Sequence, residues 1–134
     1  MNIQVLRLFR AILVLGLLVP AACHPWKRPD YGPLIDEARP LIAGITVYRR
    51  KTGEFPADFV QAGLGGPTQR PGEPDILNGW HYHRKQEGFM LGKSTGHLKD
   101  ILWYQCNSHE SLGEWYLDTD TGGPWEHIMT EPQH

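Results

Sequence analysis

The sequence predicts an α+β domain in which one N-terminal helix packs on an antiparallel β-meander of about four strands. A stripe of apolar residues at helical spacing occupies positions 33–51, and from residue 78 the apolar period changes to two. The later segments are short, and each connection between them contains glycine, which favours antiparallel neighbours. One helix can cover one face of such a sheet and so create a core.

The helix is expected over residues 33–51. Pro33 suits a first helical turn, the basic run 49–51 complements the C-terminal end of the helix dipole, and Gly53 is a suitable stop. Pro40 opposes this pattern, because an interior proline loses one backbone hydrogen bond and clashes with the preceding turn. A kink at Pro40, or a helix that begins there, is therefore expected. The apolar stripe comprises Leu34, Ala38, Leu41, Ile42, Ile45 and Tyr48.

The strands are predicted from runs of aromatic and aliphatic residues between glycine-containing turns. The four expected strands are 80–84, 89–93, 101–106 and 114–118. A short last strand over 125–129 is a further option. Residues 58–64 are expected to form one additional helical turn, and 65–74 a loop.

The first 22 residues are expected to be an export signal. Arg7 and Arg10 precede the apolar run 11–19, and small residues lead directly to Cys23. The apolar stretch is about a dozen residues, whereas a spanning helix needs about 20. The segment 19–23 resembles a lipobox, the motif at which lipoprotein signal peptidase cuts before a diacylated cysteine, although Pro20 departs from it. The resemblance implies lipidation of Cys23 and a signal at 1–22. The prolines and glycine that follow predict a tether at 23–32, and the remaining length predicts a single domain at 33–134.

Two alternatives stay open for this segment: an ordinary secreted protein that is cut after Ala22, and an uncleaved anchor. If Cys23 carries acyl chains, Cys106 is left alone, either as a buried structural thiol or in a pair between molecules. If Cys23 does not, a disulfide between Cys23 and Cys106 becomes available. His24 follows the cysteine, in place of the Asp that retains enterobacterial lipoproteins at the inner membrane. By that resemblance, the expected location is the bacterial cell envelope, on the outer membrane facing the periplasm.

The charge balance argues against a nucleic-acid partner. The chain has 13 Lys and Arg against 15 Asp and Glu, and segment 1–22 contains two of the arginines and no acid. The remaining residues therefore carry 11 basic against 15 acidic side chains, a net charge of −4 with neutral histidines. Electrostatic binding of nucleic acid requires a basic surface.

The stretch 45–56, Ile-Thr-Val-Tyr-Arg-Arg-Lys-Thr-Gly-Glu-Phe-Pro, resembles type IV pilins and type II secretion pseudopilins. In those proteins a helix ends in a Tyr and a Gly-x-(Tyr/Phe)-Pro turn, and an antiparallel meander follows. The resemblance implies a pilin-like roll. It does not extend to the N-terminus, because this chain lacks the prepilin peptidase site and the long apolar helix through which pilins polymerise.

Two groups of residues are weak metal candidates, and no cofactor is expected. His81 and His83 alternate on one strand and so share a face, where His97, His109 or His127 could complete a zinc or copper site. Asp118 and Asp120 open a loop that resembles the start of a calcium loop, but Met129 stands where the twelfth-position Glu belongs. Neither an acid pair nor a Gly-x-Ser-x-Gly motif points to an enzyme.

Adjacent aromatic residues supply the candidates for partner binding. Neighbours in a strand point to opposite faces, so Trp103 and Tyr104 cannot both enter one core, and neither can Trp115 and Tyr116. Some of these four rings should therefore bind a protein partner in the envelope or lie under loops. The sequence predicts a lipid-anchored, non-enzymatic envelope protein that acts as an interaction or assembly module. The alternative is a periplasmic inhibitor or immunity lipoprotein against a toxic or lytic enzyme.

Overall fold

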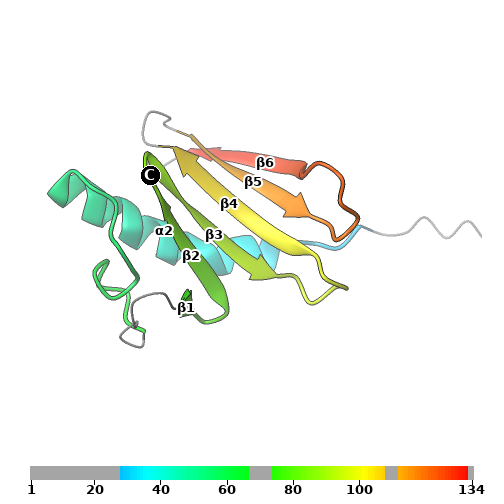
Figure 1. Cartoon of the computed structure of the whole chain (residues 1–134), viewed down its shortest axis with the longest axis horizontal. Helices are drawn as coiled ribbons and strands as arrows, with labels where there is room; N and C mark the ends of the chain where they lie inside the picture. The colour runs from blue at the N-terminus through cyan, green and yellow to red at the C-terminus, as the bar shows by residue number, and fades with distance from the viewer. Residues whose placement is uncertain (1–27, 67–73, 108–111, 133–134) are drawn as a thin grey trace, which may run out of the picture.

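The computed structural model describes residues 28–66, 74–107 and 112–132. Within them the fold is α+β, with one helix and a six-stranded antiparallel sheet in which neighbours in sequence are neighbours in space (Figure 1). The helix is α2 (Gly32–Thr52). The strands are β1 (Asp75–Leu77), β2 (Trp80–Lys85), β3 (Gly88–Ser94), β4 (Ile101–Asn107), β5 (Leu112–Asp118) and β6 (Glu126–Pro132).

The expectation of about four strands was wrong, because the sheet has six. Strand β1 is only three residues long, too short for any alternation to show in the sequence, and it is held by its pairing with β2. Strand β6 extends the optional last strand to seven residues. Its pairing with β5 is irregular between Trp115 and Tyr116, and such a bulge interrupts the period of two by which a strand is recognised.

Helix α2 runs without interruption through Pro40. The expected alternative, a helix that begins at Pro40, is therefore wrong. The buried face of α2, which lies against the sheet, outweighs the one hydrogen bond that proline removes. Gly53 ends the helix as predicted, with φ of 86° and an N–H that donates to the Arg49 carbonyl at 2.7 Å. The buried residues of the helix are Ile35, Ala38, Leu41 and Ile45.

The boundary of the predicted tether, 23–32, also shifts. Tyr31 is buried in the core and α2 begins at Gly32, so the last two residues of that segment pack with the domain. The Asp30 carboxylate accepts a hydrogen bond from the Gly32 N–H at 2.9 Å and so caps the chain entry to the helix.

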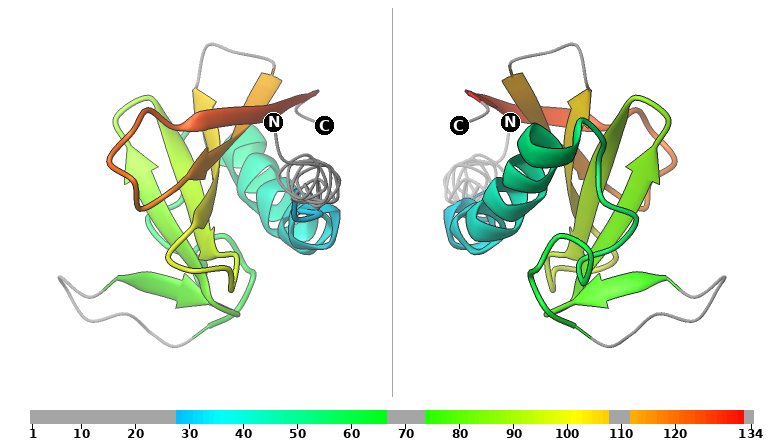
Figure 2. Two further views of the ribbon diagram at one scale, coloured as in Figure 1. Left: turned by 90° about the vertical axis from the view of Figure 1, so that its right-hand side faces the viewer. Right: turned by 90° about the vertical axis from the view of Figure 1, so that its left-hand side faces the viewer.

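The core lies between α2 and one face of the sheet (Figure 2). Its largest members are aromatic and meet in tilted or edge-on pairs, such as Trp80 with Trp115 and Tyr104 with Trp115. Such pairs add roughly 0.5–1.5 kcal/mol each beyond the area they bury. The sheet contributes Trp80, Tyr82, Phe89, Leu91, Leu102, Tyr104, Cys106, Trp115 and Leu117.

The segment between α2 and β1 adds two aromatic side chains to this core. Phe55 and Phe59 are buried in it, and the Tyr82 hydroxyl donates to the Pro56 carbonyl at 2.7 Å. The expected turn at 58–64 is present as a set of backbone hydrogen bonds, among them Ala62 N–H to the Asp58 carbonyl. In the part of the chain that the structure describes, no helix is both long enough and apolar enough to cross a membrane.

Candidate interaction surface

The sheet face opposite α2 carries a continuous row of aromatic rings. In order across this face they are His83, Trp103, Trp125, Tyr116 and His127, and we call them the outer aromatic row. Successive ring centroids lie 5.8, 5.8, 6.3 and 5.5 Å apart. Strands β2, β4, β5 and β6 supply four of the rings, and the loop before β6 supplies Trp125.

Trp125 joins Trp103 to Tyr116 in this row. Its ring stacks on that of Trp103 with only 4° between the planes, and its side chain is still 42% exposed. Trp103 in turn lies over Gly92 of β3, where an added Cβ would be 2.3 Å from the indole. The Trp103 Nε1–H is buried and has no hydrogen-bond partner among the described residues. The indole thus contacts both the sheet backbone and a second indole.

Only two of the four predicted partner-binding aromatics lie on this face. Trp103 and Tyr116 are half-buried in the outer aromatic row, whereas Tyr104 and Trp115 are 1% and 0% exposed in the core. The opposite-face rule was therefore correct, but it does not say which member of each pair faces the helix. Tyr104 and Trp115 are adjacent cross-strand partners in β4 and β5, and α2 covers their side of the sheet.

The two histidines of β2 share the outer face, as their spacing predicts. His83 packs at a tilt against Trp103, and burial there lowers its pKa below the usual histidine value, with a smaller contribution from the charge of His81. His97 lies 3.5 Å from Asp100, and His127 packs edge-on against Tyr116. Across the described ranges, no three His, Cys, Asp or Glu side chains are placed to hold a metal ion.

The loop after β5 places its one carboxylate, Asp120, and its two hydroxyls in local contacts. Asp120 pairs with Lys99 at 3.0 Å, and the Thr119 and Thr121 hydroxyls are 2.9 Å apart. Gly122 adopts φ of 69°, which a tight turn requires. Asp118 ends β5, where it pairs with Ile101 of β4. The Asp120–Lys99 ion pair thus connects the loop between β5 and β6 to the loop between β3 and β4.

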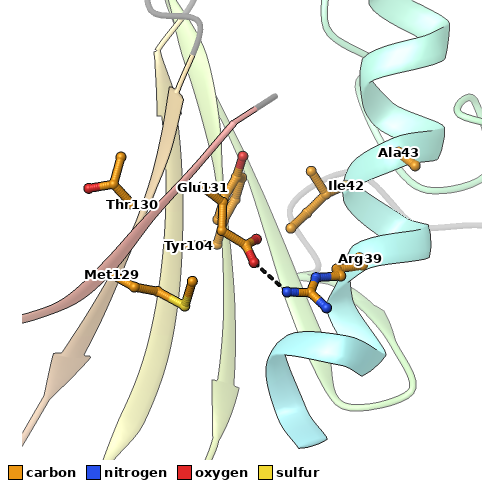
Figure 3. A pocket seen from close by; sticks show the side chains of 7 residues that line it. All are labelled: Arg39, Ile42, Ala43, Tyr104, Met129, Thr130 and Glu131. Carbon is orange, nitrogen blue, oxygen red and sulfur yellow. Dashed lines mark hydrogen bonds and ion pairs between the residues drawn. The ribbon is translucent and has the colours of Figure 1, made fainter. Parts of the chain in front are cut away.

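A pocket of about 550 Å³ lies between α2 and β6 (Figure 3). Glu131 crosses it: its carboxylate accepts from Arg39 of the helix at 2.7 Å and from the Trp115 indole at 3.1 Å. This ion pair raises the pKa of the Arg39 guanidinium. The remaining lining residues, mostly apolar, are Ile42, Ala43, Tyr104, Met129 and Thr130. The pocket lies where the helix meets the last strand.

The predicted lipidation site, Cys23, lies outside the described residues. Cys106 is buried in the core, as expected for a structural thiol, and its Sγ is 3.7 Å from the Asn107 carbonyl oxygen. Sequence reasoning did not find Gly92, Arg39 or Glu131. A glycine in the interior of β3, Gly92, was the only available sign of a ring lying across that strand.

Comparisons with protein-family models, with curated proteins and with solved structures found no match to this chain. The function must therefore be argued from the site and from the residues of the chain itself.

Proposed function

We propose that this chain is a lipid-anchored, non-enzymatic protein of the bacterial cell envelope that acts as an interaction or assembly module. The observation that carries the proposal is the outer aromatic row, which lies on the sheet face that α2 leaves uncovered. Tyr and Trp are enriched at the centres of protein interfaces, because each offers a large rigid surface and one polar atom. The partner proposed for this face is a protein of the same compartment.

The row suits a protein partner for three physical reasons. Trp103 and Trp125 are pre-stacked, so little conformational freedom is lost on binding. The Tyr116 hydroxyl is already oriented by a hydrogen bond to Glu114. Flanking polar residues at the rim, His81 and Gln105 among them, are half-buried and can hydrogen bond to a partner.

For the fold we propose a pilin-like roll, which would make this protein a pilin-like head on a lipid anchor. Two features support it: α2 lies along one face of an antiparallel meander, and the stretch from Tyr48 to Pro56 ends that helix in the manner of pilins. The anchor proposal rests on the lipobox-like segment that ends at Cys23. An acylated head domain would be held at the membrane and need not enter a filament.

The anchor is tested by growing bacteria that express the full chain with an alkyne fatty acid, beside a Cys23→Ser variant. Label on the native chain alone is the expected result. Absence of label on both chains, at equal expression, would refute the anchor and make the Cys23–Cys106 disulfide the next structure to test.

The interaction surface is tested by placing a photo-crosslinking amino acid at position 116 or 125, and at Val47 as a control. Val47 is an exposed apolar residue of α2, on the other side of the sheet. We expect one envelope protein to crosslink from 116 and 125 but not from 47. Equal capture at all three positions would refute the outer aromatic row as the binding surface. A toxic or lytic enzyme as the captured protein would instead favour the inhibitor alternative.

A further inference from the structure

The tether enters the domain at one particular end. Arg28, the first described residue, forms an ion pair with Glu126 at the start of β6. The loop between β3 and β4 (95–100) and the loop between β5 and β6 (119–125) lie at this same end (Figure 1). The Lys99–Asp120 ion pair joins the two loops. We call Arg28 and these two loops the tether end.

The tether end includes a leucine, Leu98, that does not belong to the hydrophobic core. Leu98 is 85% exposed, the most exposed of the large hydrophobic side chains in the described ranges. Its backbone φ is 53°, in the left-handed region that glycine and asparagine adopt more readily than leucine. Neither core packing nor backbone preference therefore accounts for a leucine at this position.

The polar side chains next to Leu98 in sequence have local partners. Lys99 contacts Asp120, and the His97 imidazole lies 3.5 Å from the Asp100 carboxylate. Trp125, also partly exposed, lies in the adjoining loop of the same end. A projecting apolar side chain, flanked by the Lys99–Asp120 ion pair, matches the chemistry of the lipid headgroup region.

We propose that the tether end docks on the lipid bilayer with the Leu98 side chain inserted among the headgroups. This inference rests on the proposed lipid anchor at Cys23. The five residues from there to Arg28 can span at most about 18 Å, so an acylated Cys23 would hold the tether end close to the membrane surface. One leucine cannot hold a free protein on a bilayer, but the anchor makes its insertion an intramolecular step at high effective concentration.

The experiment uses the full chain, purified from membranes in its acylated form and reconstituted into phosphatidylcholine vesicles. An environment-sensitive fluorophore is attached to Leu98→Cys, or to Val60→Cys as the matched control. Val60 is also an exposed apolar residue, in the turn that follows the opposite end of α2. The acylated Cys23 cannot react with the reagent, and Cys106 is buried.

We expect blue-shifted emission, quenched by spin-labelled lipid, at position 98 and water-like emission at position 60. The fluorophore is the same at both sites, so a difference reports how the domain sits on the membrane. Flotation of the protein with the vesicles is measured in parallel. Flotation with water-like emission at position 98 overturns the docking alone, whereas loss of flotation overturns the anchor and the docking together.

Discussion

Trp103 lies directly over Gly92, its cross-strand neighbour in β3. Because this residue has no Cβ, the indole can approach the sheet backbone closely, and the same indole stacks with Trp125. Trp103 therefore contacts both the backbone of β3 at Gly92 and the ring of Trp125. This arrangement depends on one glycine and positions the centre of the outer aromatic row.

Substitution of Gly92 by Ala is expected to displace Trp103 and separate it from Trp125. The new Cβ would stand 2.3 Å from Trp103 Cζ3, and the rigid ring is also stacked with Trp125. We expect a loss of about 1–3 kcal/mol in the free energy of unfolding, measured by urea denaturation, with a change in the near-UV circular dichroism of the stacked indoles. The control is Gly123→Ala, whose Cβ would meet only the Thr121 hydroxyl at 3.6 Å. Identical spectra for wild type and Gly92→Ala would contradict the stacking argument.

Glu131 is expected to hold β6 to the helix. Its side chain is only 15% exposed and accepts hydrogen bonds from Arg39 and from the Trp115 indole. Glu131→Leu leaves the buried indole N–H without its acceptor and should cost about 1–3 kcal/mol of unfolding free energy. Glu131→Gln keeps an acceptor for that N–H and should cost less.

The control is Asp36→Ala, which removes only the exposed partner of Arg39 and should change stability by less than about 1 kcal/mol. Equal losses for Leu and Gln at position 131 would show that the indole hydrogen bond does not matter.

Local patterns predicted most of the fold. The helix ended at Gly53 and strands β2 to β5 formed where the apolar period changed, because each of these features is encoded within a few neighbouring residues. Strand β1 escaped prediction, since three residues carry no period and the strand exists only through its pairing with β2.

The site was harder to predict, because it depends on which face of the sheet the helix covers. Alternation placed Trp103 and Tyr104 on opposite faces but could not say which one faced α2. The Arg39–Glu131 pair links residues 92 positions apart, and no local pattern reports such a contact. Gly92 under Trp103 is likewise a cross-strand relationship that appears only once β3 and β4 are paired.

His83 is expected to make stability depend on pH near neutrality. Burial against Trp103 lowers its pKa in the folded state, so the unfolded chain binds a proton more readily. The unfolded state then holds more protons, and stability falls as pH decreases through the ordinary histidine value of about 6.5. Thermal unfolding between pH 7.5 and 5.5 should show this loss in the wild type and a smaller one in His83→Gln. His97→Gln is the control, and an equal effect of both substitutions would contradict a specific role for His83.

Tyr82 is expected to report on the closure of the core at alkaline pH. Its buried hydroxyl donates to the Pro56 carbonyl, and burial raises its pKa well above the ordinary tyrosine value of 10.0. The folded state therefore retains a proton that the unfolded state loses, so stability falls as pH rises above about 10. Tyr82→Phe should lose about 1–2 kcal/mol at pH 7, because the Pro56 carbonyl loses its donor. It should also show a weaker decline above pH 10. Spectrophotometric titration of Tyr82 at the ordinary value in the folded protein would contradict this argument.

Leu98→Gly is expected to stabilise the isolated protein while it removes the proposed bilayer contact. The left-handed backbone at φ of 53° costs a leucine roughly 1–2 kcal/mol, and glycine avoids that strain. Because glycine also has a larger conformational entropy to lose on folding, the net gain in unfolding free energy should be about 0.5–1 kcal/mol.

Leu98→Ala is the control, since it removes the exposed side chain but keeps a Cβ in the same backbone conformation. Chemical denaturation in solution should therefore rank Gly above Ala and Leu, which should be nearly equal. If Ala stabilised the protein as much as Gly, the gain would come from removing an exposed apolar side chain and the backbone argument for Leu98 would fail.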